Sequence, residues 1–155
     1  MKSVAAVTLL FAAAFALPVS AADDHKIFNA QEVKWAPAPP SIPKGAEAAV
    51  LFGDPSKEGL FAMRLKFPKG YVIPPHSHPK PEVLTVISGT FQVGMGDKAD
   101  KSKVNPLAAG GFFGFPPGMN HFAYVDEETV VQLNSTGPWG LTYVDPKDDP
   151  RQKSQ

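Results

Sequence analysis

A short stretch in the middle of the chain carries two histidines and a glutamate at even spacings. His76 and His78 are two residues apart, and Glu82 follows four residues after His78. Successive side chains of an extended segment point to opposite faces, so both imidazoles are predicted to project from one face. A carboxylate beside them needs a cation if the spot is buried, because an unpaired buried charge is costly. The spacing therefore predicts a metal site.

A third imidazole follows a second segment that is rich in glycine and proline. His121 would complete a set of three histidines and one carboxylate, a mixture that suits a divalent transition metal. We expect one Mn or Fe ion, with Ni, Zn, Cu and Co as alternatives. Three of the four histidines belong to this set, which argues against the alternative of ordinary hydrogen-bonded or surface histidines. The chain has no cysteine, so thiolate ligands and disulfide bonds are excluded.

The beginning of the 155-residue chain is predicted to be removed after export. Residues 1–22 resemble a secretory signal peptide, because a basic start precedes an apolar run and small residues that suit cleavage near Ala21 or Ala22. The apolar run is shorter than the roughly 18–20 residues of a membrane-spanning helix. We therefore expect a periplasmic or secreted protein without membrane contact. Cleavage after Ala22 would expose Asp23-Asp24-His25, whose amine, amides and imidazole could chelate Cu(II) or Ni(II).

The remaining chain is long enough for one compact domain. Residues 23–45 are predicted to be a Pro-rich arm that lies over the domain or a partner subunit, with a disordered linker as the alternative. Residues 46–145 are predicted to form a β-barrel, and residues 146–155 a polar tail. The formal net charge is zero, and Lys and Asp are spread along the chain, so no nucleic-acid partner is expected.

Short runs of apolar and β-branched residues, separated by glycine and proline, predict an all-β sandwich or barrel, since no sustained helical periodicity occurs. In residues 61–67 the alternation predicts that Phe61, Met63, Leu65 and Phe67 face the core. Residues 83–87 and 90–95 flank Ser88-Gly89, which predicts a hairpin. Residues 96–105 are expected to be a solvated loop. The other predicted strands are residues 49–52, 112–115, 121–125, 130–134 and 140–144.

Two signatures make the chain resemble the cupin family. The first reads Gly70, five residues, His76, one residue, His78, three residues, Glu82, six residues and Gly89. The second reads Gly110, five residues, Pro116, one residue, Gly118, two residues and His121. Its usual final Asn falls at Val125, a departure that affects a supporting position and not coordination.

The resemblance implies an all-β, single-domain jelly-roll barrel of cupin type and a homodimer. It also implies that His76, His78, Glu82 and His121 are the metal ligands. The glycines and prolines of both signatures also have physical roles. Glycine allows the backbone to turn, and proline stiffens the segment that leads to the predicted ligands.

The predicted ligand set suits several kinds of reaction. Four protein ligands leave one or two positions on the metal for water, dioxygen or an organic ligand. We expect a metal-dependent enzyme, an oxidoreductase of dioxygenase type, that acts on a small organic substrate. The alternatives are a non-catalytic protein that binds a small molecule or sugar with a structural metal, and a metal-dependent isomerase or lyase.

Several apolar side chains are candidates for the substrate pocket, with ordinary core packing as the alternative role. No further carboxylate adjoins the first signature, so proton transfer would fall to metal-bound hydroxide, to Glu82 or to a tyrosine. Of the tyrosines, Tyr71 is the better candidate, because the parity of Tyr124 with His121 points Tyr124 away from the metal. The pocket candidates are Phe61, Met63, Phe91, Phe113, Phe115 and Trp139.

Overall fold

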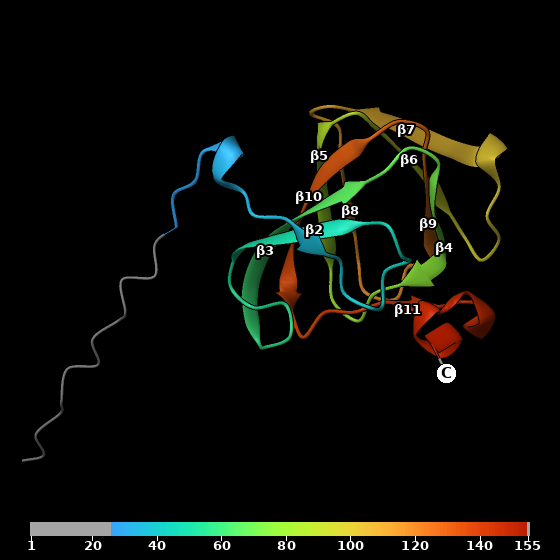
Figure 1. The fold of residues 1–155 in the computed structure, drawn as a ribbon. Helices are drawn as coiled ribbons and strands as arrows, with labels where there is room; N and C mark the ends of the chain where they lie inside the picture. Colours follow the sequence, from blue (N-terminus) through green and yellow to red (C-terminus); the bar gives the residue numbers. More distant parts are fainter. Residues whose placement is uncertain (1–25, 155) are drawn as a thin grey trace, which may run out of the picture.

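Two antiparallel sheets enclose the core in the computed structural model, which describes residues 26–154 (Figure 1). The first sheet has the order β1 (Ala36–Pro37), β2 (Glu47–Phe52), β3 (Gly59–Phe67), β10 (Thr129–Gly137), β5 (Glu82–Ser88) and β8 (Phe112–Phe115). The second has the order β11 (Thr142–Tyr143), β4 (Tyr71–Ser77), β9 (His121–Val125), β6 (Thr90–Met95) and β7 (Val104–Ala108). Short 3-10 turns are η1 (Ala30–Glu32), η2 (Lys101–Lys103), η3 (Pro146–Asp148) and η4 (Pro150–Ser154).

This arrangement confirms the predicted jelly-roll class. The sheets face each other as the two walls of a barrel, and in residues 26–154 no strand ladder joins one sheet to the other, so the barrel is not closed by hydrogen bonds. The predicted inward face of residues 61–67 is also confirmed, because Phe61, Met63, Leu65 and Phe67 are each at most 5% exposed. Their burial removes apolar surface from water and so stabilises the fold.

The predicted hairpin around Ser88-Gly89 is wrong. Strand β5 pairs with β10 and β8, whereas β6 pairs with β7 and β9 in the other sheet. The chain therefore turns a corner between the sheets at this point. Gly89 has φ of 75°, and the Thr129 hydroxyl donates to the Thr90 carbonyl at 3.2 Å, which holds the corner against the start of β10. Tight-turn composition alone does not distinguish such a corner from a hairpin.

The expected loop at residues 96–105 also needs correction. It contains η2, and its end enters β7, which pairs with β6. Pro106 in this strand has no N–H to donate, which is compatible with the edge position of β7 in its sheet.

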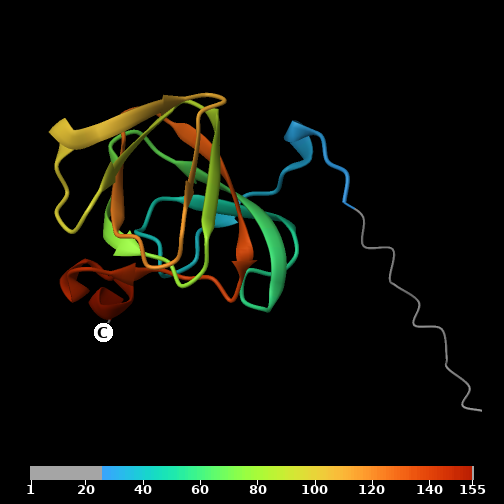
Figure 2. The same cartoon turned by 180° about the vertical axis from the view of Figure 1, so that it is seen from behind.

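The Pro-rich segment approaches the barrel after residue 35. Strand β1 pairs with β2, the Tyr143 hydroxyl donates to the Ser41 carbonyl at 2.7 Å, and the Tyr71 hydroxyl donates to the Pro43 carbonyl. Ile42, between these two anchored residues, is 5% exposed. Residues 26–35 lead away from the barrel, on the side opposite the C-terminal turns (Figures 1 and 2). The predicted signal peptide and Asp23-Asp24-His25 lie outside the described residues.

In residues 26–154, no helix is both long and apolar enough to cross a membrane.

The corner at Gly89 generates a stability prediction. A Cβ there would lie 2.5 Å from the Glu128 carbonyl oxygen, in a left-handed conformation that side chains disfavour. Gly89→Ala should therefore lower the free energy of unfolding by at least about 2 kcal/mol, measured by urea denaturation. The control is Gly114→Ala on β8, where the nearest atom to a Cβ lies at 3.7 Å. An equal loss in both variants would contradict this role for Gly89.

Candidate metal centre

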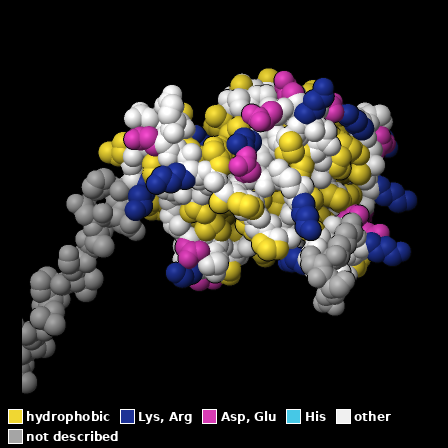
Figure 3. Space-filling view, in the orientation of Figure 1, with side chains coloured by type: hydrophobic (Ala, Val, Ile, Leu, Met, Phe, Trp, Pro, Cys, Tyr) yellow, Lys and Arg dark blue, Asp and Glu magenta, His cyan; other side chains and the backbone are white. Residues whose placement is uncertain are grey.

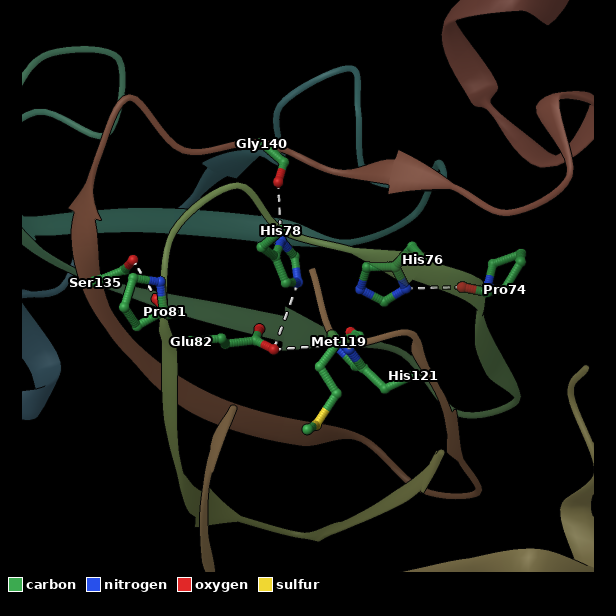
Figure 4. Close-up of polar contacts among 9 residues, drawn as sticks. All are labelled: Pro74, His76, His78, Pro81, Glu82, Met119, His121, Ser135 and Gly140. Carbon is green, nitrogen blue, oxygen red and sulfur yellow. Dashed lines mark hydrogen bonds and ion pairs between the residues drawn. The ribbon is translucent and has the colours of Figure 1, made fainter. Parts of the chain in front are cut away.

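Three strands bring the four predicted ligands together inside the barrel (Figure 4). His76 lies on β4, His78 follows the end of that strand, Glu82 begins β5 and His121 begins β9. All four side chains are buried, with at most 6% exposure. Ligand nitrogen atoms of the three histidines lie within 4.8 Å of one another. No histidine side chain is visible on the face of the described residues in Figure 3.

A bulge at Pro74-Pro75 directs His76 to the interior. Ile73 pairs with Ala123 and His76 pairs with His121, so β4 uses one more residue than β9 between these pairs. Without the bulge, residues 73 and 76 would face opposite sides of the sheet. With it, both side chains line the same cavity. Two adjacent prolines, which donate no ladder hydrogen bonds, favour such an irregularity.

Backbone carbonyl groups fix the protonation pattern of all three imidazoles. The Nδ1 atoms of His76 and His121 lie 2.8 and 2.9 Å from the carbonyl oxygens of Pro74 and Met119, each two residues earlier. The Nδ1 atom of His78 lies 2.9 Å from the Gly140 carbonyl oxygen. A carbonyl oxygen only accepts, so each Nδ1 carries the proton and donates it. Each neutral ring then offers its Nε2 lone pair for coordination.

The four groups form a set that a cation would satisfy. Glu82 Oε2 lies 3.0 Å from His121 Nε2 and 3.4 Å from His78 Nε2. Nevertheless, Glu82 Oε2 and His78 Nε2 are buried without a hydrogen-bond partner, since both are acceptors in the protonation pattern given above. Buried acceptors that face one another are costly unless a positive charge lies between them. The residues present therefore fit a divalent metal.

Burial and the neighbouring rings keep His76 in its neutral form. Burial first, and then the neighbouring His121 and His78, lowers the pKa of His76 to about 3, so its ring is neutral at neutral pH. The Ser135 hydroxyl donates to the Pro81 carbonyl at 2.5 Å, which fixes the approach to Glu82 (Figure 4).

The cluster lies at the wall of a small cavity that is otherwise apolar. Its volume is about 20 Å³, and its wall includes Phe91 and Phe113 from the predicted pocket set. Phe61 and Met63 are buried in the core but do not line this cavity, and neither does Phe115, whose ring centroid lies 5.1 Å from that of His121.

The candidate for proton transfer lies elsewhere. Tyr71 is not among the cavity residues, and its hydroxyl donates to the Pro43 carbonyl. Burial raises the pKa of Tyr71 above its ordinary value, which disfavours loss of its proton. Tyr124 lies on β9 one residue after Ala123, which does line the cavity. Tyr124 therefore faces the other side of the sheet.

Other contributors to the site were not found from the sequence. Ile42 comes from the Pro-rich segment and Leu141 from the connection between β10 and β11, and both line the cavity. They reach it through contacts between residues far apart in the chain, which leave no local pattern. The carbonyl partners of His76 and His121 share one local signal, a spacing of two residues.

Part of the chain is similar to plant germin-like proteins. A rice (Oryza sativa subsp. japonica) protein provisionally named germin-like protein 9-2 is 36% identical over 101 residues, which is 64% of this chain and 46% of the relative. The chain thus spans less than half the length of this curated relative. Further relatives from rice and Arabidopsis thaliana are also germin-like proteins.

Solved structures with low sequence identity share the fold. The polyketide cyclase RemF from Streptomyces resistomycificus has a TM-score of 0.66 at 16% identity, covering 84% of this chain and 93% of that one. A protein from Methylibium petroleiphilum PM1, provisionally described as an acetylacetone dioxygenase, has a TM-score of 0.60 at 19% identity, covering 81% and 85%. At these identities the likeness concerns the fold alone.

A family model matches a larger part of the chain. It is described as the ChrR cupin-like domain and covers residues 23–140, more than half of the sequence. The match contains both signatures and every residue of the buried cluster. The chain therefore belongs to the cupin family.

Proposed function

We propose that this protein is an exported metal-dependent cupin enzyme, of dioxygenase type, that acts on a small organic substrate. One divalent metal, Mn or Fe, is held by His76, His78, Glu82 and His121. The buried cluster supports this most directly, because three Nε2 lone pairs and a carboxylate converge at the wall of an apolar cavity. The proposal of export is supported by residues 1–22, whose sequence resembles a signal peptide.

The metal, its ligands and the apolar wall would have different roles in such a site. A bound Mn or Fe ion supplies open coordination positions and redox chemistry. His76, His78 and His121 present fixed lone pairs, since their Nδ1 protons are held by carbonyl groups. The Glu82 carboxylate balances part of the cation's charge, and the apolar wall excludes water from a bound substrate. The cavity volume of about 20 Å³ favours a small ligand, since one water needs about 10–15 Å³.

Alternative chemistries use the same cluster. A fold shared with a polyketide cyclase is compatible with a metal-dependent isomerase or lyase, and a ligand-binding protein with a structural metal would need the same four residues. These alternatives differ from the proposed reaction in whether oxygen is consumed and whether the ligand is changed.

The ligand set predicts the effect of single substitutions on metal content. Glu82→Gln and His121→Ala should each weaken Mn or Fe binding by more than about 100-fold, because the loss of even an outer-shell partner costs about 10- to 100-fold. Titration calorimetry and elemental analysis after dialysis measure this effect. Tyr124→Phe, on the same strand as His121, and His25→Ala, which removes the fourth histidine, should keep full metal content. Stoichiometric tight binding by both ligand variants would refute the assignment.

The proposed reaction predicts oxygen uptake. Protein loaded with Mn or Fe should consume dioxygen with at least one member of a panel of diketones, phenols and organic acids, followed with an oxygen electrode and product analysis. The rate should fall by more than about 100-fold in His121→Ala, in parallel with its metal content. Conversion of a panel member without oxygen uptake would favour an isomerase or lyase. Binding without conversion would favour the non-catalytic alternative.

A homodimer is also proposed, on the basis of the exposed outer face of the first sheet. Leu60 of β3 is 71% exposed and Phe112 of β8 is 59% exposed, with Val83 of β5 between them at 38%. Exposed apolar groups that lie on one sheet face are typical of a contact surface.

The dimer predicts a change in mass when this face becomes polar. The double substitution Leu60→Ser and Phe112→Ser should convert a dimer to a monomer in light scattering after gel filtration. Val72→Ser, at a 42% exposed position of the other sheet, serves as the control. A wild-type protein that is monomeric at all concentrations would contradict the proposal.

A further inference from the structure

The connection between β10 and β11 places an indole beside the predicted ligands. The Trp139 ring stacks on the His78 ring, with centroids 4.7 Å apart and an interplanar angle of 15°. Its other neighbour is Phe61, at 6.2 Å and 67°. The Trp139 backbone N–H donates to the Pro55 carbonyl at 2.8 Å. Because the Gly140 carbonyl accepts a hydrogen bond from His78 Nδ1, this connection and the imidazole hold each other in place.

The indole carries a polar group that has no partner. Trp139 Nε1 is buried and makes no hydrogen bond, although a buried indole N–H ordinarily finds an acceptor. Trp139 also lines the cavity that contains the metal-binding cluster. An unsatisfied buried donor costs free energy, so an acceptor that enters this cavity would relieve the cost.

The composition of the cavity wall makes this donor distinctive. Apart from the three histidines, Glu82 and Trp139, every lining side chain is an aliphatic or aromatic hydrocarbon. The Nδ1 protons of the histidines are already used by backbone carbonyl groups. The Trp139 N–H is therefore the one polar side-chain group of the wall that is neither a predicted ligand nor already bonded.

We propose that Trp139 determines substrate specificity by donating its indole N–H to an oxygen of the substrate, and that the substrate is a small organic anion such as a carboxylate or enolate. This inference rests on the proposed function, because the metal anchors the ligand beside the indole. A divalent ion and one carboxylate leave a net positive charge in an apolar cavity, which favours an anion. The Trp139 N–H then donates a hydrogen bond to a substrate oxygen that is not bound to the metal.

The two tryptophans of the chain allow a direct test by nuclear magnetic resonance. Trp35 lies away from the cavity, with Lys66 Nζ 4.8 Å from its ring centroid, and serves as an internal control. Nitrogen-15-labelled protein is loaded with diamagnetic Zn(II) and titrated with acetate. The indole N–H resonance of Trp139 should shift downfield and saturate, whereas that of Trp35 should stay in place. The Trp35→Phe variant assigns the two resonances.

Matched variants measure the size of the effect. Trp139→Phe keeps an aromatic ring against His78 but removes the donor, and should weaken acetate binding about tenfold at unchanged zinc content. Trp35→Phe should bind acetate as the wild type does. Because the resonance shift is measured on protein that retains Trp139, the test stands even if Trp139→Phe does not fold.

The outcomes separate this inference from the proposed function. A stationary Trp139 resonance while acetate binds to the zinc form would overturn the donor role alone, as would equal acetate affinity in Trp139→Phe and Trp35→Phe. Zinc-loaded protein that does not bind acetate would overturn the ligand class. Wild-type protein that takes up no zinc would overturn the proposed metal site, and this inference with it.

Discussion

The site depends on one electrostatic constraint, the burial of a carboxylate against imidazole lone pairs. Glu82 Oε2 and His78 Nε2 lie 3.4 Å apart, and neither has a hydrogen-bond partner. In water such a pair would be solvated, whereas inside the barrel a bound cation would compensate both atoms. The carbonyl groups that bind the Nδ1 protons enforce the constraint, because they prevent the rings from donating toward the carboxylate by a change of tautomer.

The scaffold meets this constraint by joining elements from both sheets. Strands β4 and β9 of the second sheet supply His76 and His121, and β5 of the first sheet supplies Glu82. The connection after β10 adds Trp139 and the Gly140 carbonyl over His78. The Pro-rich segment adds Ile42, held between two carbonyl groups that accept from buried tyrosines. The site is thus formed by contacts between distant parts of the chain.

The sequence predicted what is local and missed what is long-range. The inward face of residues 61–67 and the shared direction of His76 and His78 could be read because strand alternation is a property of near neighbours. The four clustered side chains are of types that suit a metal, and their role as ligands stays a prediction. The separation of β5 and β6 into different sheets could not, since the residues at Ser88-Gly89 suit a hairpin and a corner equally. Ile42 and Leu141 were missed because no local spacing relates them to the histidines. Trp139 was predicted only as an aromatic residue of the pocket. Only the structure shows that its N–H has no hydrogen-bond partner.

The bulge at Pro74-Pro75 has a consequence for how the first signature should be understood. Side chains along a strand face its two sides in turn. The extra residue between Ile73 and His76 changes this alternation once. A chain one residue shorter here would need no bulge, because its histidine would follow Ile73 by two positions and face the same side. The bulge therefore lets two consecutive prolines precede His76 while the imidazole still faces the cavity. A change that straightened the bulge without shortening the chain would turn this imidazole to the outer face of the sheet.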